Sequence, residues 1–424
     1  MATRISLFQH MLTSAAALRC GLLLEPQYVA EEACDLPGLF NVAVPEDPSN
    51  PWQTVSGAVG MTRESALIGA IAEGLERYAA AFVAARTVPR SKIPDTERLD
   101  ECQFACFSDE QFGRPDFPWA TQAKPEDLFA QVFSLLDNRS RWVPQEWVGL
   151  GPRTGEARLP STSSGLAAFR PVEGGPWMAM LRASQELLER DALATTWLNG
   201  LGGREIPLPA AWREQVQARG GEVYAFDMTQ EWNPHPVVAV AGGIPRRGEP
   251  RYCLGIACRA TRDEALQKAW LEWGQALTFA GFLKRSRGVE LPRHAAQLRR
   301  FDEHAVFYTL RPDLWPKTAL IAHRQPFIPV ERFAPAPAAA IDQLDQLVHQ
   351  LAQSGVDLYY RELTTRDVAA AGLHVIRVLS PQLTGLHADE RAPFLGGRCK
   401  DVRWRYGNAA RFTAFPNPLP HPLG

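Results

Sequence analysis

The sequence predicts an α/β protein in which mixed sheets pack against helices, and three observations lead to this class. Apolar residues recur with a helical period in some segments and alternate, or form short runs, in others. These segments follow one another without the regular rhythm of βαβ units, which argues against a doubly wound parallel sheet. Hydrophobic residues make up 46% of the chain and charged residues 22%, which excludes a disordered or collagen-like protein.

The predicted elements come from these two periods. The helical period predicts helices over residues 65–85, 178–197, 262–282 and 338–353. Short apolar runs bounded by Gly, Pro and Asp predict strands over 132–136, 223–228, 237–241, 252–258, 358–363 and 374–379. Stretches rich in Gly and Pro at 149–162 and 242–250 are expected to be loops.

Composition and charge exclude several classes of function. The 47 acidic and 45 basic residues give a net charge of -2, so no basic surface for nucleic acid is expected. The seven cysteines are odd in number and lack zinc-knuckle spacing, which indicates reduced thiols in a cytoplasmic protein. No apolar run approaches the length of about 18 residues that a membrane span requires. The chain also lacks the P-loop, dinucleotide, zinc-protease and serine-hydrolase motifs.

An internally repeated motif is the most informative feature of the sequence. The heptapeptide AEGLERY begins at Ala72, and QELLERD begins at Gln185 on a second predicted helix. A related acidic segment, KAWLEWGQ, begins at Lys268. The long separation of these copies indicates a duplicated helical element and not a solenoid repeat, whose period runs from about 20 to 50 residues.

The first of these helices carries its charges among small residues. One side presents an apolar stripe, and the other presents Glu73, Glu76 and Arg77. The simplest interpretation is that these charges face water. A solvated face, however, would also carry Lys, Gln and Glu. Here small residues surround the charges and would let another backbone or a ligand come close: Ala66, Gly69, Ala70, Ala80 and Ala84.

The second helix is apolar in almost every direction except one stripe, which contains Arg182, Glu186, Glu189 and Arg190. Pairing of Glu186 with the arginines four residues before and after it is a purely structural alternative. The third helix places Lys268, Glu272 and Gln275 on one face, which by itself is an ordinary ion pair.

Taken together, the charges of these helices suggest one kind of ligand. Clustered carboxylates suit a hard cation, and Mg²⁺ commonly joins carboxylates to substrate phosphates. Interspersed Arg and Lys suit phosphate oxygens. The sequence therefore predicts that Mg²⁺ bridges a nucleotide polyphosphate to the carboxylates without a P-loop.

The order of these motifs resembles the YcaO-domain family. Gly57-Ala-Val-Gly-Met-Thr62 precedes the first acidic helix, and Ser163-Ser-Gly-Leu-Ala-Ala168 precedes the second. The chain ends on FPNPLPHPLG, with proline at alternate positions. In this combination the chain is most similar to the D-type cyclodehydratase subunits of microcin-type synthetases, which make thiazole- and oxazole-modified peptides. It departs from many relatives at Gly69, Ser164, Met178 and Lys268.

The resemblance implies a YcaO fold and an ATP- and Mg²⁺-dependent cyclodehydratase, in which a Cys, Ser or Thr side chain of a ribosomal peptide closes on the preceding amide and forms an azoline. It also implies roles for individual residues. The metal would be held by Glu73, Glu76, Glu186, Glu189 and Glu272. ATP would contact these five residues together with Arg77, Ser164, Arg190, Lys268 and Gln275. The tail would reach the active centre and contribute Pro418, Pro420, Pro422 and Gly424 to catalysis.

The resemblance further implies an organisation and partners. We expect an N-terminal segment (1–20), a catalytic domain (21–410) and a proline-rich tail (411–424). Because the chain leaves no room for the peptide-binding domain of fused relatives, we expect an E1-like partner, a flavin-dependent azoline dehydrogenase, a precursor peptide and a cytoplasmic multi-subunit synthetase. Two alternatives stay open: a YcaO enzyme that makes thioamides or amidines, and a non-catalytic subunit that binds nucleotide and scaffolds a synthetase.

Overall fold

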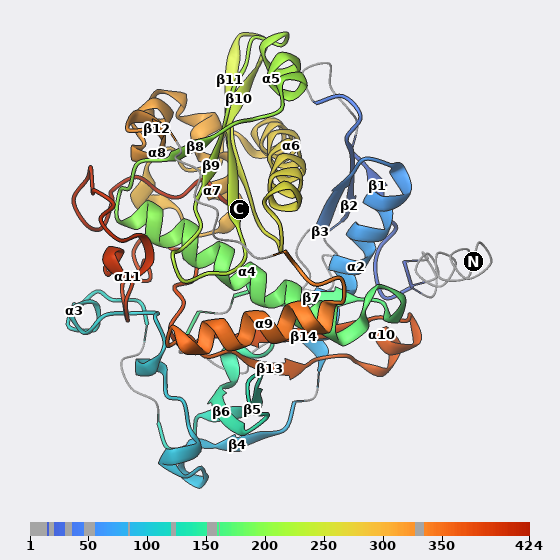
Figure 1. The fold of residues 1–424 in the computed structure, drawn as a ribbon, viewed down its shortest axis with the longest axis vertical. Helices are drawn as coiled ribbons and strands as arrows, with labels where there is room; N and C mark the ends of the chain where they lie inside the picture. Colours follow the sequence, from blue (N-terminus) through green and yellow to red (C-terminus); the bar gives the residue numbers. More distant parts are fainter. Residues whose placement is uncertain are drawn as a thin grey trace.

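Helices separate and cover the β-sheets of the molecule (Figure 1). This computed structural model describes residues 15–16, 21–29, 36–45, 56–83, 85–119, 124–150, 159–160, 162–326 and 335–424. Most of the predicted N-terminal segment 1–20 lies outside these residues.

The described strands form three sheets, and most neighbouring strands are antiparallel. The small sheet has the order β1-β2-β3, the second β11-β10-β9-β8-β12, and the third β4-β5-β13-β14-β7 with β6 beside β5. Only the short β12 and β8 pair in parallel among the described strands. The bounds are β1 Gln27–Tyr28, β2 Phe40–Val44, β3 Ser56–Gly60, β4 Thr87–Pro89, β5 Leu128–Ser134, β6 Ser140–Pro144, β7 Leu166–Phe169, β8 Arg204–Ile206, β9 Glu222–Asp227, β10 Val237–Arg246, β11 Glu249–Cys258, β12 Gln325–Pro326, β13 Tyr359–Glu362 and β14 His374–Leu379.

The long helices are α2, α4, α6 and α9, and α4 crosses the molecule between the second and third sheets (Figure 1). Helix α9 covers α4 on one side, and α6 packs on β10 and β11. The helix bounds are α2 Arg63–Phe82, α3 Asp109–Phe112, α4 Gly175–Leu198, α5 Ala210–Gln217, α6 Arg262–Arg287, α7 Phe301–Leu310, α8 Ala319–Ala322, α9 Ala340–Gln353, α10 Arg366–Ala370 and α11 Val402–Tyr406.

The mixed α/β class is confirmed. Every predicted helix and strand is present, β14 with the predicted bounds and the others with shifted ends. The predicted loop at 242–250 is wrong. Strand β10 continues to Arg246 and pairs with β11 up to the turn at Arg247 and Gly248, both of which have positive φ. The glycines that suggested a loop serve close packing: a side chain on Gly242 would clash with the backbone of β9.

Helix α2 begins at a capping box and rests closely on β3. The side chain of Thr62 accepts a hydrogen bond from the backbone N–H of Ser65, and the Ser65 hydroxyl faces the N–H of Thr62 in return. A Cβ on Gly69 would lie 2.8 Å from the Cβ of Ala58, so this small residue lets the strand approach the helix. The small residues around the charges of α2 thus accommodate a neighbouring backbone, one of the two outcomes expected for them.

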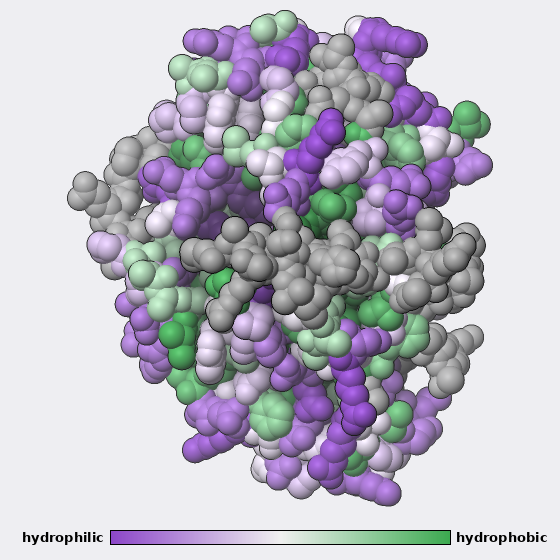
Figure 2. All heavy atoms as spheres, turned by 90° about the vertical axis from the view of Figure 1, so that its right-hand side faces the viewer, coloured by the Kyte–Doolittle hydropathy of each residue, from purple (hydrophilic) through white to green (hydrophobic). Residues whose placement is uncertain are grey.

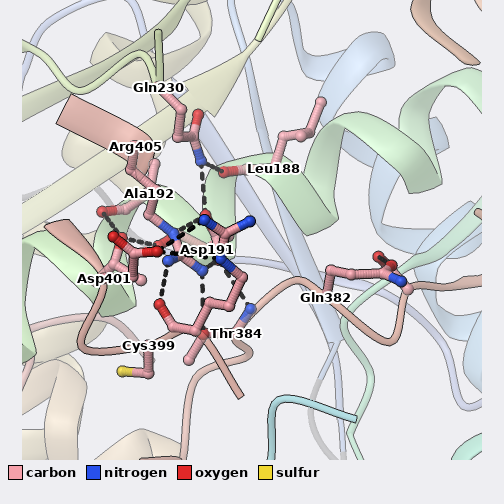
Figure 3. Close-up of polar contacts among 12 residues, drawn as sticks. Leu188, Asp191, Ala192, Gln230, Gln382, Thr384, Cys399, Asp401 and Arg405 are labelled. Carbon is pink, nitrogen blue, oxygen red and sulfur yellow. Dashed lines mark hydrogen bonds and ion pairs between the residues drawn. The ribbon is translucent and has the colours of Figure 1, made fainter. Parts of the chain in front are cut away.

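Helix α4 is fixed by a buried polar network around Asp191 (Figure 3). Both carboxylate oxygens of Asp191 bind the guanidinium of Arg405, at 2.7 and 2.9 Å. The same carboxylate accepts hydrogen bonds from Gln230 Nε2 at 3.0 Å and from the backbone N–H of Thr384 at 2.8 Å. Because a buried carboxylate is costly unless it is paired, this network determines where α4 sits.

Figure 2 shows the side of the molecule that carries the small sheet and α2. Among the coloured atoms, hydrophilic side chains predominate, and hydrophobic ones form small separate patches. Within the described ranges, no helix is both long and apolar enough to span a bilayer.

Candidate functional site

Glu73 on α2 joins the helix to the small sheet. Its carboxylate accepts a hydrogen bond from the backbone N–H of Gly57 in β3 at 2.8 Å and binds Arg77 Nη2 at 2.6 Å. Gln275 of α6 also approaches this point, because its Nε2 would lie 3.7 Å from a Cβ on Gly57. The carboxylate is therefore oriented by a strand and by an arginine one helical turn further on.

Glu186 on α4 repeats this arrangement. It accepts a hydrogen bond from the backbone N–H of Gly165, just before β7, at 3.0 Å, and from Arg190 Nη2 at 3.2 Å. The duplication predicted from the sequence is thus present in the bonding pattern. The alternative pairing of Glu186 holds only for Arg190, since Arg182 donates to Gln185 Oε1 at 2.8 Å.

Glu76 faces the second copy across the space between α2 and α4. Its pKa is raised from 4.5 to about 8, first by burial and then by the negative charges of Glu186 and Glu73. Arg77 and Arg377 oppose the shift. Glu186 on α4 therefore lies close enough to disfavour the ionisation of Glu76 on α2.

Glu189 connects the second copy to the third helix. This buried carboxylate accepts a hydrogen bond from the backbone N–H of Cys258, at the end of β11, at 3.2 Å. Burial raises its pKa to about 8; Arg190, 3.7 Å away, counteracts the rise, whereas Glu272 and Glu186 add to it. On α6, Lys268 Nζ lies 3.0 Å from Glu272, so the expected ion pair is present.

The structure therefore brings the predicted carboxylates and cations into one group. They come from α2, α4 and α6, each of which follows a strand of a different sheet, and Glu186 influences both raised pKa values. The group, which we name the carboxylate cluster, consists of Glu73, Glu76, Glu186, Glu189 and Glu272 with Arg77, Arg190 and Lys268.

Arg377 on β14 is a further charge at this site that the sequence did not reveal. Its guanidinium is fully buried and donates to the carbonyl oxygens of Ser164, Thr162 and Val148 at 2.7, 2.9 and 3.1 Å. Burial lowers its pKa to about 10, while Glu186 and Glu76 oppose this effect. An arginine within the apolar strand HVIRVL was the available signal.

Predicted Ser164 lies in the loop that Arg377 holds. The serine is buried, and its backbone N–H donates to Thr162 Oγ1 at 3.0 Å. Met178, in the first turn of α4, is half-buried and packs on the hydrophobic core beside Gly174.

The donor chemistry of the carboxylate cluster fits Mg²⁺. Among the described residues, no three His, Cys, Asp or Glu side chains form a group that could hold a metal ion. Within the cluster, the carboxylates of Glu73, Glu186 and Glu189 each accept a hydrogen bond from a backbone N–H. Glu76 and Glu189 nonetheless have strongly raised pKa values. A hard divalent cation would stabilise the ionised form of these carboxyls against the effects of burial and of their acidic neighbours, and carboxylate oxygen is its preferred ligand.

The C-terminal tail packs against α4 and α7. Pro420 and Pro422 are buried, whereas Pro418 and Gly424 are exposed. Asn417 donates its backbone N–H to the Leu198 carbonyl at 2.8 Å. Burial lowers the pKa of His421, the charges of His304 and His387 add to this effect, and Arg190 makes a smaller contribution. The tail is thus held against α4, the helix that carries the second acidic motif.

Comparisons with known proteins agree with this geometry. The family model of the YcaO cyclodehydratases, described as ATP- and Mg²⁺-binding, matches residues 57–384, which contain the whole carboxylate cluster. No curated protein sequence matches the chain.

Three solved structures are similar to this chain in fold. A heterocyclase in complex with substrate and cofactor has a TM-score of 0.77 and 17% identity, over 96% of this chain and 57% of its own length. YcaO from Methanopyrus kandleri, bound with AMPPCP and Mg²⁺, has a TM-score of 0.63 and 17% identity over 90% of each chain. A chain of the E. coli microcin synthetase McbBCD complex has a TM-score of 0.62 and 15% identity, over 95% of this chain and 98% of its own.

Proposed function

Because the chain belongs to the YcaO cyclodehydratase family, with its ATP- and Mg²⁺-binding site, we propose that it is an ATP-dependent enzyme that forms azolines in a ribosomal precursor peptide. The observation that carries the proposal is the carboxylate cluster, in which α2, α4 and α6 bring five carboxylates together with Arg77, Arg190 and Lys268. Burial first, and then acidic neighbours, raise the pKa values of Glu76 and Glu189. Such a cluster suits cation-assisted binding of a polyphosphate better than it suits a structural core.

The proposed reaction removes one amide oxygen at each ring. A Cys, Ser or Thr side chain attacks the preceding carbonyl carbon, and its proton goes to a base or to solvent. The resulting oxyanion takes the γ-phosphoryl group of ATP and releases ADP. Loss of the amide proton and departure of phosphate then leave the C=N bond of the azoline. Phosphorylation is required because an amide oxygen is a poor leaving group.

We assign roles in this reaction as the sequence predicted them. The carboxylates Glu73, Glu76, Glu186, Glu189 and Glu272 would hold Mg²⁺, which neutralises phosphate charge when it is bound. Arg77, Arg190 and Lys268 would face phosphate oxygens, and Ser164 and Gln275 would complete the ATP site. To the predicted set we add Arg377, which fixes the loop of Ser164.

The tail and the partners are also part of the proposal. Pro418, Pro420, Pro422 and Gly424 would act at the peptide end of the site; the packing of the tail on α4, which carries Glu186 and Glu189, supports this role. The fold neighbours include a heterocyclase in complex with substrate and a chain of a three-component synthetase, which supports a peptide substrate and a multi-subunit assembly. An E1-like partner would deliver the precursor, and a flavin-dependent dehydrogenase would oxidise azolines to azoles.

A single experiment tests the function. The purified chain, its genomic-neighbour partner and a Cys- and Ser-rich precursor are incubated with ATP and Mg²⁺, and phosphate release and peptide mass are followed. We expect loss of one water per ring, matched by one ADP and one phosphate, and loss of both signals with EDTA. Exchange of sulfur for oxygen would select thioamide formation instead. Absence of both phosphate and mass change would favour the non-catalytic scaffold.

A further inference from the structure

The buried end of the chain is held by side chains that bind its backbone. Residues 420–423 are buried, although they are almost the last of the chain. Three consecutive carbonyl groups each face a polar side-chain atom of α4 or α7. The contacts are Trp197 Nε1 to Leu419 O at 2.8 Å, Tyr308 OH to Pro420 O at 2.7 Å, and His304 Nδ1 to His421 O at 3.1 Å.

This arrangement matches what a proline-alternating segment offers. Pro420 and Pro422 have no backbone N–H, so the segment cannot be held by the hydrogen-bond ladder of a sheet. Its carbonyl groups remain available, and donors on rigid helices satisfy them. Leu423 packs in the hydrophobic core, and a Cβ on Gly424 would lie too close to Ala305 of α7. The packing of Leu423 and Gly424 therefore fixes the position of the last residues.

His304 lies at the centre of the surface that binds the tail. Its Nδ1 faces the carbonyl of His421, and its Nε2 faces the carbonyl of Ala388 at 3.0 Å. A neutral ring has one N–H and can donate to only one of these carbonyls. The ring of His421 stacks on His304 with centroids 4.1 Å apart, and its Nε2 faces the carbonyl of His387 at 2.7 Å. Both nitrogens of His304 and Nε2 of His421 thus face backbone oxygens, whereas the buried Nδ1 of His421 has no hydrogen-bond partner.

We propose that Trp197, Tyr308 and His304 are positioning residues that clamp the tail against α4 and α7. The role assigned to the clamp rests on the proposed function, because it matters for turnover only if the tail acts in ring formation. Loss of a clamp contact would release the end of the chain and lower kcat for ring formation, whereas the KM for ATP would change little because the carboxylate cluster remains intact.

Matched variants distinguish the clamp from general destabilisation. Tyr308→Phe removes the hydroxyl bond to Pro420, and Tyr360→Phe removes a hydroxyl bond at 3.2 Å to Asn138, far from the tail. His304→Asn keeps a donor near the Nδ1 position, whereas His304→Gln keeps one near Nε2. The Asn variant should therefore retain the tail better than the Gln variant.

The first readout is release of Gly424 and Leu423 by a carboxypeptidase, followed by mass spectrometry of the intact chain. Since one net hydrogen bond changes an opening equilibrium about fivefold, Tyr308→Phe should speed release by about that factor, and Tyr360→Phe should not. Equal release rates in the two tyrosine variants would overturn the clamp.

The second readout is kcat and KM for ring formation in the reconstituted synthetase. We expect kcat to fall in the order of the release rates, with the KM for ATP unchanged. Faster release with wild-type kcat would overturn the positioning role. If the wild-type chain forms no ring, the proposed function fails, and the release rates still decide whether the clamp exists.

Discussion

Asp191 and Arg405 form a bidentate ion pair in which both side chains are fully buried. This pair links the segment after β14 to the middle of α4. Asp191 directly follows Arg190 in the second acidic motif. Asp191 belongs to the motif by sequence, but its role is structural. Its carboxylate accepts hydrogen bonds from Arg405, Gln230 and Thr384. The pair holds α4 in the register that presents Glu186 and Glu189.

Removing one partner of this pair should destabilise the chain severely. We expect Asp191→Asn to lower the free energy of unfolding by about 3 to 5 kcal/mol, because a buried guanidinium loses its counter-charge. Urea unfolding followed by circular dichroism measures the change. Asp401→Asn, which breaks the exposed pair with Arg398, is the control and should cost at most about 1 kcal/mol. Equal losses in the two variants would contradict the role given to Asp191.

The raised pKa of Glu76 makes stability depend on pH. A carboxyl whose pKa is about 8 in the fold and 4.5 as a model group stabilises the fold fully below the lower value and loses this contribution as the pH rises through about 8. Glu76→Gln should therefore raise the Tm by about 2 °C at pH 8.5 and leave it unchanged at pH 4.5. Thermal unfolding across this range without Mg²⁺ tests it, and a Glu64→Gln control at the exposed start of α2 should show no such pH dependence.

Glu189 should be required for turnover and dispensable for folding. We expect Glu189→Gln to reduce ring formation at least about a hundredfold, the scale of losing a charge that acts on the transition state. The amide can still accept the hydrogen bond from Cys258, so the Tm should stay within about 2 °C of wild type. Mass spectrometry of the peptide gives the rate and calorimetry the Tm. A wild-type rate would show that this carboxylate is structural.

Mg²⁺ should bind more tightly as the pH rises towards 8. Binding requires ionised carboxylates, and those of Glu76 and Glu189 carry protons below that pH. Calorimetry in two buffers of different ionisation enthalpy should show proton release at pH 7 and almost none at pH 9. Equal affinity and no proton release at both values would place the metal away from these side chains.

Gly165 should tolerate no side chain. Its φ is +79°, and a Cβ there would clash with the carbonyl of Val378. We expect Gly165→Ala to cost more than about 2 kcal/mol and to weaken ATP binding, because the backbone must shift and displaces the N–H that donates to Glu186. Gly248→Ala has a similar φ with no atom within 4 Å of the new Cβ, so it should cost about 1 kcal/mol. Equal costs would show that the clash is irrelevant.

The helices could be predicted because the helical pattern of apolar residues extends over many turns and one face is more buried than the other. Helices α2 and α4 were predicted to within a few residues, as was β14. The hairpin of β10 and β11 was partly misread as a loop, since Gly242 and Gly243 have a loop-like composition but lie in a strand where close packing excludes side chains. Composition does not distinguish these two uses of glycine.

Only the side-chain groups of the site could be predicted from the sequence, and its backbone donors could not. The acidic motifs contain the carboxylates that come together, and their repetition pointed to Glu73 and Glu186. The backbone donors of Gly57, Gly165 and Cys258 follow from strand placement, which no local pattern encodes. Arg377 was not predicted as a site residue, because the apolar residues around it indicated only a buried strand.

The shared position of Glu186 has a consequence for ligand binding. Its negative charge acts on Glu76 towards α2 and on Glu189 towards α6. A cation that neutralises Glu186 from one side therefore eases ionisation on the other side, and thermodynamic linkage makes the effect mutual. The two halves of the carboxylate cluster should consequently fill cooperatively, so that a Mg²⁺ titration is sigmoidal and exchange of Glu186 for Gln makes it hyperbolic.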